Sequence, residues 1–195
     1  MGTSDAVREH VEWGTSSSGG GSAKVATEDR LKGWQNADFG ARVWRKDPTL
    51  WSPVPVPELA DRLGWLDLPN LAAEEVARLE AFGAQLAAEG IRHVIVLGMG
   101  GSSLAPEVFQ RTFGNAQGYP SLRILDSTHP RAVAELAGEI ELAKSVFMVS
   151  SKSGGTTETM SFFRFFWAQA KAAGLDAGRH FVAVTDPGTS LEKLA

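Results

Sequence analysis

Four short apolar runs in the second half of the chain constrain its fold more than any other feature. They read HVIVLG (93–98), LRILD (122–126), SVFMVS (145–150) and FVAVT (181–185). All four are apolar along their length instead of alternating with polar residues, which is typical of strands covered on both faces. Segments with helical character lie between them, near 103–113, 130–139 and 157–173. This alternation predicts right-handed βαβ units and therefore an α/β fold, a doubly wound three-layer αβα sandwich with a parallel sheet.

A further helix is predicted before the first run. Its apolar residues recur at helical spacing, at Val76, Leu79, Phe82 and Leu86. Asn70 is placed to cap this helix at its amino-terminal end, and Gly90 is placed to end it.

The sequence before residue 71 differs in character from the rest. Residues 14–23, GTSSSGGGSA, resemble a linker, and we predict that residues 1–27 form a flexible N-terminal segment. Residues 28–70 are expected to be an irregular arm with short helices, because WSPVPVP cannot form a central strand. We expect the tryptophans of this arm to pack on a neighbouring surface, and they are Trp34, Trp44, Trp51 and Trp65. Residues 71–195 are then the folded α/β domain.

Composition excludes several classes of function. The chain has no cysteine, which removes disulfides, thiol chemistry and the main ligand of soft metals. Its four histidines do not share helical ligand spacing, so no metal and no cofactor are expected. A net charge of -4 gives no reason to expect a nucleic acid or an acidic membrane as a partner. Without a signal peptide or a membrane-spanning run, a cytoplasmic location is the default expectation.

The residues that follow the four apolar runs are small and polar. They read GMGGSS, LDSTHP, SSKSGGTTET and VTDPGTS, and each is followed by a helix. Ligands of parallel α/β sheets bind at the carboxyl ends of strands, near the point where the strand order reverses. Two of these loops read mainly as turns and caps, with Ser127 or Thr128 placed to cap the helix at Pro130 and TDPGTS a turn and cap.

The third loop indicates a phosphate site. Residues 150–159 carry six hydroxyl side chains, one lysine and two glycines. Hydroxyls and free amides at a helix amino terminus can donate to anionic oxygens, and glycine lets the backbone approach closely. A cap uses only one or two of these side chains. The loop lacks carboxylates that would hold the magnesium of a nucleotide, which favours a phosphate site without metal.

The first loop fits other phosphate motifs poorly. In the dinucleotide pattern G-x-G-x-x-G, Ser103 stands where the third glycine belongs, although Asp126 closes the next strand as that pattern requires. The loop also lacks the lysine of a Walker motif and the G-x-S-x-G of a nucleophile elbow. A nicotinamide-binding domain is therefore the weakest of the hypotheses.

Two of these loops carry a family resemblance. GMGGSSLAP resembles the G-[IM]-G-G-S-x-L-x-P loop of glucose-6-phosphate isomerases, and SKSGGTTET resembles their phosphate loop S-K-[ST]-x-x-T-x-E-T. The chain, from about residue 40 onward, resembles the first sugar-isomerase (SIS) domain of that family. ARVWRKDPTLW, LGWLDLP and TDPGTSLEKLA are most similar to the branch in which the isomerase follows a transaldolase domain. SGG departs toward the S-Q-S-G-E-T of glucosamine-phosphate synthases, whereas Lys152 and the terminal TET keep the isomerase pattern.

The resemblance implies a set of site residues. It places the substrate phosphate on Ser151, Ser153 and Thr156, with a backbone contact from Lys152 and with Thr159 nearby. Gly101 and Ser102 would lie along the sugar chain, and Glu158 would take a supporting catalytic role. The substrate would be glucose 6-phosphate or fructose 6-phosphate, interconverted through an enediol.

The resemblance also implies what is missing. In the family, the main catalytic groups lie in the second half of the enzyme, beyond the part that this sequence resembles. They are the glutamate that acts as the base, the arginine that stabilises the enediolate, and the histidine and lysine that open the sugar ring. We therefore expect a sugar-phosphate-binding half that is inactive alone. The alternative is a stand-alone SIS module that binds a sugar phosphate as a regulator. The helix near 157–173 carries MSFFRFFW, whose aromatic residues cover more than one face, which indicates a dimer mate or a second SIS domain as a partner.

Overall fold

The structure is a computed structural model that describes residues 20–56, 59–60, 62–70 and 73–195. The chain divides into two units, Met1–Leu71 and Ala72–Ala195, and each is described here by itself.

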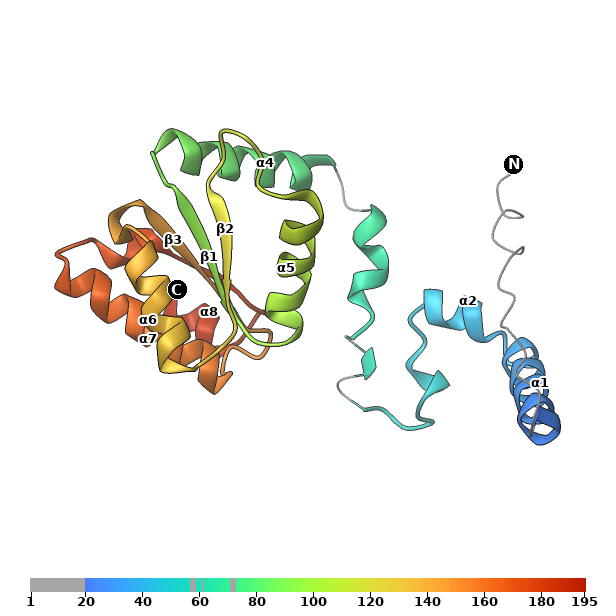
Figure 1. The fold of residues 1–195 in the computed structure, drawn as a ribbon. Helices are drawn as coiled ribbons and strands as arrows, with labels where there is room; N and C mark the ends of the chain where they lie inside the picture. Colours follow the sequence, from blue (N-terminus) through green and yellow to red (C-terminus); the bar gives the residue numbers. More distant parts are fainter. Residues whose placement is uncertain (1–19, 57–58, 61, 71–72) are drawn as a thin grey trace. The chain divides into compact units, whose positions relative to one another are not determined.

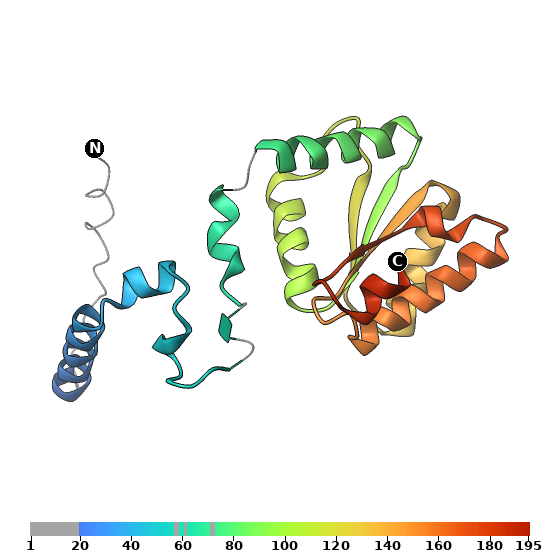
Figure 2. The ribbon, with the colours of Figure 1, turned by 180° about the vertical axis from the view of Figure 1, so that it is seen from behind.

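The second unit is built on a sheet of four parallel strands, which confirms the predicted fold class. The strands are β1 (His93–Gly98), β2 (Ser121–Leu125), β3 (Ser145–Ser150) and β4 (Phe181–Val184). Their order in the sheet is β2-β1-β3-β4, and all three pairs are parallel. The central strands β1 and β3 are the more deeply buried, whereas the edge strands β2 and β4 are mostly half-buried. From behind, β4 is seen at the edge of the sheet away from β2 (Figure 2).

Helices follow the strands and cover both faces of the sheet (Figure 1). They are α5 (Gly101–Phe113), α6 (Pro130–Glu139), α7 (Thr157–Ala172) and the short α8 (Ser190–Leu194), with 3-10 turns η3 (Leu142–Lys144) and η4 (Ala177–His180) before β3 and β4. Helix α5 packs on one face, against β1 and β2, and α6 and α7 pack on the other. Helix α4 (Ala73–Ala88) lies beside the amino-terminal ends of β1 and β2.

The core lies between the sheet and α6 and α7. Its strand residues alternate along β1 and β3 and are Ile95, Leu97, Phe147 and Val149, none more than 2% exposed. Phe166 of α7 is fully buried and stacks on Phe147, with ring centroids 4.6 Å apart. These aromatic side chains each bury a large apolar area, so this layer contributes much of the stability of the unit.

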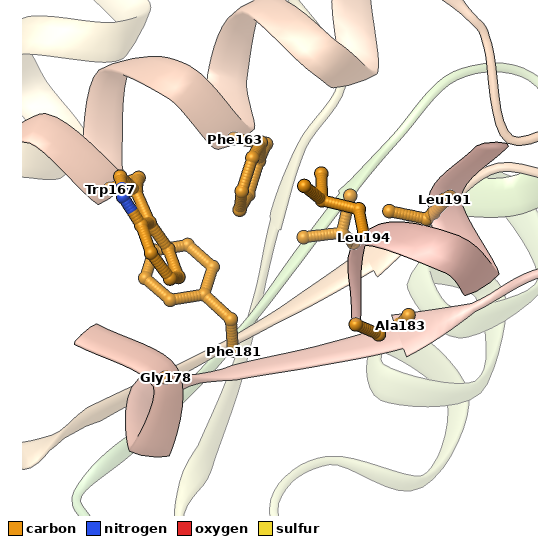
Figure 3. A pocket seen from close by; sticks show the side chains of 9 residues that line it. Phe163, Trp167, Gly178, Phe181, Ala183, Leu191 and Leu194 are labelled. Atoms are coloured by element: carbon orange, nitrogen blue, oxygen red, sulfur yellow. The ribbon is translucent and has the colours of Figure 1, made fainter. Parts of the chain in front are cut away.

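Most of the aromatic residues of α7 pack inside their own unit. Phe162 and Phe166 are in the core, and Phe163 and Trp167 lie 5.4 and 5.2 Å from the ring of Phe181. Phe163 and Trp167 also line an apolar cavity of about 270 Å³ between α7, β4 and α8, shown in Figure 3. Only Phe165 of this group is strongly exposed, at 38%. Phe163 and Trp167 thus pack on the edge strand β4, so Phe165 is the one aromatic residue of this group left exposed, and the partner that the sequence indicated for this helix stays a prediction.

Most of the exposed large apolar side chains of this unit lie on α4 and α5. Val76, Leu79 and Phe82 are 37–58% exposed, and of the predicted stripe Leu86 alone is buried. On α5 the exposed apolar residues are Leu104, Val108, Phe109 and Phe113. The predicted cap of α4 by Asn70 stays a prediction, because residues 71 and 72, which separate Asn70 from Ala73 of α4, lie outside the described residues.

The described residues of the first unit include α1 (Gly20–Asn36), α2 (Phe39–Trp44), and the 3-10 helices η1 (Pro48–Leu50) and η2 (Gly64–Asn70). Residues 20–27, predicted to be flexible, belong to α1, and the rest of the predicted flexible segment lies outside the described residues. The four tryptophans of the arm are 44–66% exposed, so the structure does not bury them within the described part of this unit. Among the residues of this unit whose burial is described, Leu66 is the only buried one, although Trp34 stacks on Phe39 with ring centroids 5.2 Å apart.

Candidate functional site

The strand order brings the first and third loops together. From β1 the chain runs to β2, which lies on one side of β1 in the sheet. It then crosses over to β3, which lies on the other side of β1, so the strand order reverses between β1 and β3. Gly98, the last residue of β1, pairs in register with Ser150, the last residue of β3. The loops that follow them are neighbours at one edge of the sheet, where parallel α/β sheets bind their ligands.

Two positions of the first loop favour glycine. A Cβ on Gly98 would lie 3.1 Å from both the Cβ and the carbonyl oxygen of Ser102, so a side chain there would force the turn into α5 to shift. Gly100 has a φ of 53° and a ψ of -122°, a conformation that side chains exclude. These constraints place Gly101 and Ser102 at the first turn of α5, beside the third loop.

The third loop, residues 151–156, is braced by Ser151. This side chain is 1% exposed, and its Oγ lies 2.9 Å from the Oγ1 of Thr156 and accepts a bond of 3.4 Å from the Thr156 amide. Its own amide donates to the carbonyl of Val184 at 3.0 Å, and its carbonyl accepts from the Gly154 amide at 3.0 Å. Ser151 therefore fixes the loop from inside, whereas Lys152 and Ser153 are exposed.

Side chains do not cap the helix that this loop begins. Of the four helices that follow strands, α6 is capped by His129, whose Nδ1 accepts from the Arg131 amide, and α8 by Thr189, whose Oγ1 accepts from the Glu192 amide. Thr156 at the start of α7 makes no such bond. The first amides of this 16-residue helix thus lack a side-chain acceptor, although hydroxyls surround them. Free amides and the positive end of a helix dipole favour an anion at this position.

The prediction that Ser127 or Thr128 caps α6 was wrong. Ser127 instead accepts a bond of 3.3 Å from the amide of His129, and the imidazole performs the cap one residue nearer to the helix. His129 is thereby occupied in the turn.

The structure gathers the residues that the resemblance proposed, at different depths. Gly101, Lys152 and Ser153 are exposed, and Ser102, Thr156 and Glu158 are half-buried near the amino termini of α5 and α7. Ser151 and Thr159 are buried, and the Oγ1 of Thr159 has no hydrogen-bond partner. The exposed and half-buried hydroxyls of Ser153 and Thr156 are thus better placed to meet a ligand directly than the hydroxyl of Ser151.

Sequence reasoning missed a second layer of residues behind the loop. The segment 185–190 after β4 contacts the loop through Thr185, Asp186 and Ser190, all of which bond its backbone carbonyls. The sequence does carry a signal for it, since TDPGTS follows a strand that neighbours β3. Its function toward the loop cannot be deduced without the pairing of β4 with β3.

Other features of the described chain do not add to this site. The cavity in Figure 3 is lined mainly by apolar side chains, and the labelled residues around it come from α7, η4, β4 and α8. Within residues 20–56, 59–60, 62–70 and 73–195, no group of three His, Asp or Glu side chains is placed to hold a metal ion. No helix in these same ranges is long and apolar enough to cross a membrane.

Comparison with known proteins assigns the family. The sequence model of phosphoglucose isomerase matches residues 74–195, which contain β1 to β4 and both loops. The chain belongs to the phosphoglucose isomerase family.

Individual members of the phosphoglucose isomerase family are similar over most of this chain. The glucose-6-phosphate isomerase of Geobacter sulfurreducens is 35% identical over an alignment of 151 residues that covers 67% of this chain and 28% of the relative. The enzyme of the same name from Thermosynechococcus vestitus is 29% identical over 173 residues, 82% of this chain and 30% of the relative. The chain thus spans less than a third of the length of these relatives.

Solved structures agree with the assignment to the phosphoglucose isomerase family. The crystal structure of a glucose-6-phosphate isomerase from Chlamydia trachomatis has a TM-score of 0.56 and 26% identity, covering 76% of this chain and 28% of that one. A hypothetical protein from Thermus thermophilus has a TM-score of 0.59 and 28% identity, covering 85% of this chain and 39% of that one.

Proposed function

We propose that the chain is the sugar-phosphate-binding half of a glucose-6-phosphate isomerase. The observation that carries the proposal is the start of α7, where a long helix without a side-chain cap meets exposed hydroxyls beside β1. A phosphate monoester offers three oxygens to such a set of donors, and amides and hydroxyls bind a charged oxygen more strongly than a neutral one. In this proposal Ser153 and Thr156 bind the phosphate directly, Lys152 adds charge and a backbone contact, and Gly101 and Ser102 lie along the sugar.

Ser151, Thr159 and Glu158 take supporting functions in the proposal. Ser151 holds Thr156 in place through their 2.9 Å hydroxyl contact, and Thr159 lies in the first turn of α7. Glu158 is the one carboxylate within the two loops 98–103 and 150–159. Moving a proton between adjacent carbons needs a positioned base as well as acid–base groups that open the ring. We propose that this chain binds fructose 6-phosphate without isomerising it, because one supporting carboxylate does not supply that set.

The binding site is tested by removing one exposed hydroxyl. Ser153→Ala is expected to weaken the affinity for fructose 6-phosphate about tenfold, because a hydrogen bond to a charged oxygen is lost. Isothermal titration calorimetry measures the change, and Ser161→Ala is the control, since Ser161 bonds the Thr157 carbonyl on the exposed side of α7. Equal affinities of the wild type and Ser153→Ala would contradict the placement of the phosphate.

The wider context of the chain also stays a proposal. We propose that a second SIS domain or a dimer mate covers the exposed apolar residues of α4 and α5, such as Phe82 and Phe113. Sedimentation tests the dimer: a wild type that stays monomeric at high concentration would contradict it. The similarity to isomerases fused to transaldolase is a prediction that the gene sequence around this chain tests.

A further inference from the structure

We propose that Thr185 and Ser190, in the segment 185–190 between β4 and α8, are positioning residues that aim two backbone amides of the 151–156 loop at the ligand phosphate. The inference rests on the proposed function, since it assumes that an anion binds this loop. It assigns a function to a segment that does not itself need to touch the ligand.

The first contact holds the peptide between Lys152 and Ser153. The carbonyl of Lys152 accepts hydrogen bonds from the Asp186 amide at 3.2 Å and from the Thr185 hydroxyl at 3.3 Å. A trans peptide is planar, and its carbonyl and its N–H point in opposite directions. Fixing this carbonyl toward segment 185–190 therefore turns the amide of Ser153 away from the segment.

The second contact holds the peptide between Gly154 and Gly155. The hydroxyl of Ser190 donates to the carbonyl of Gly154 at 2.9 Å. By the same planarity the amide of Gly155 points away from Ser190. The Gly155 amide makes only a long bond of 3.4 Å, to Ser153 Oγ. Two amides of a short, exposed loop thus face away from the segment that holds them, which is the arrangement of an anion-binding concavity.

The segment is itself held at both ends. It leaves the sheet at β4, where Val184 pairs with Ser150, and it enters the core at Leu191, which is 3% exposed. Between these ends Thr189 Oγ1 lies 2.9 Å from Thr185 Oγ1 and accepts from the Glu192 amide at 3.2 Å. The segment also packs closely against the loop at Gly154, because a Cβ at this position would lie 2.6 Å from the Cβ of Thr189. A rigid support of this kind keeps the donors in place before the ligand arrives.

The test uses the full 195-residue chain and two probes, inorganic phosphate and fructose 6-phosphate. Ser190→Ala is expected to weaken the binding of both probes about 5- to 10-fold and by the same factor, because the lost bond acts on the loop that holds the phosphate. Ser190→Thr keeps a hydroxyl and is expected to restore binding to within about twofold of the wild type. Thr185→Val and Thr185→Ser form a second matched pair, and Ser161→Ala is the control for a hydroxyl that bonds a carbonyl outside the loop.

A readout in the wild type keeps the inference testable if a variant fails to fold. Phosphate is expected to shift the amide resonances of Ser153 and Gly155 in nitrogen-15 NMR spectra. If the wild type binds both probes while Ser190→Ala binds them equally well and these two amides do not shift, the inference is overturned and the proposed function stands. If the wild type binds neither probe, the proposed function fails and the inference falls with it.

Discussion

Replacing Phe166 by alanine is expected to reduce the free energy of unfolding of the second unit by about 3–5 kcal/mol. The side chain is fully buried, stacks on Phe147 at 4.6 Å and meets Phe165 edge-on at 5.0 Å. Its removal loses the transfer free energy of an aromatic ring and leaves a cavity that the strands on one side cannot fill. Urea unfolding followed by circular dichroism measures the loss.

Phe113→Ala is the matched control for this change. Phe113 ends α5 and is 81% exposed in the single chain, so at a concentration at which the chain is monomeric its truncation is expected to alter stability by less than about 0.5 kcal/mol. A cost below about 1 kcal/mol for Phe166→Ala would contradict the placement of α7 on the sheet.

Replacing Gly154 by alanine is expected to cost about 2–4 kcal/mol and to abolish phosphate binding. Gly154 has a φ of 68°, which alanine adopts only with strain, and the new Cβ would lie 2.6 Å from the Cβ of Thr189 and 3.0 Å from the amide nitrogen of Leu191. The backbone must move to relieve this overlap, and the amides of the loop move with it. Thermal unfolding and titration with fructose 6-phosphate measure the two effects.

Gly155→Ala is the control for Gly154→Ala, because it also replaces a glycine of the loop by alanine, but at a position without a close contact. No atom lies within 4 Å of the position that a Cβ on Gly155 would take, and its φ is not in the left-handed region. The free energy of unfolding of Gly155→Ala is expected to stay within about 1 kcal/mol of the wild-type value. If the two alanine variants were equally stable, the close contact between Gly154 and Thr189 would be refuted.

The sheet was predictable because its signal is local. Runs such as HVIVLG and SVFMVS are apolar throughout, and the structure places β1 and β3 over these same residues. The polar loops at the strand ends could also be found, since Gly98 and Ser150 close their strands as the sequence indicates. The helix from Pro130 to Glu139 was predicted with its bounds, because proline marks its first residue.

The rest depends on contacts between distant residues. The packing of Phe163 and Trp167 on Phe181 depends on β4, which lies later in the chain, so the sequence of the helix alone did not indicate it. Which side chains cap a helix depends on the conformation of the preceding turn. In the turn before α6 the imidazole of His129 accepts from the helix amide, whereas Ser127, the predicted cap, accepts from the amide of His129. The hydrogen bond from Ser190 to the 151–156 loop joins residues that are 36 positions apart in the sequence, and no local pattern encodes it.

Titration of the full chain with fructose 6-phosphate, with an isomerase assay on the same sample, tests the account most directly. The account predicts saturable binding that inorganic phosphate displaces and that Ser153→Ala weakens, without formation of glucose 6-phosphate. Absence of binding, or binding without displacement by phosphate, would contradict the assignment of the site. Turnover by the chain alone would contradict the view that it is only the binding half.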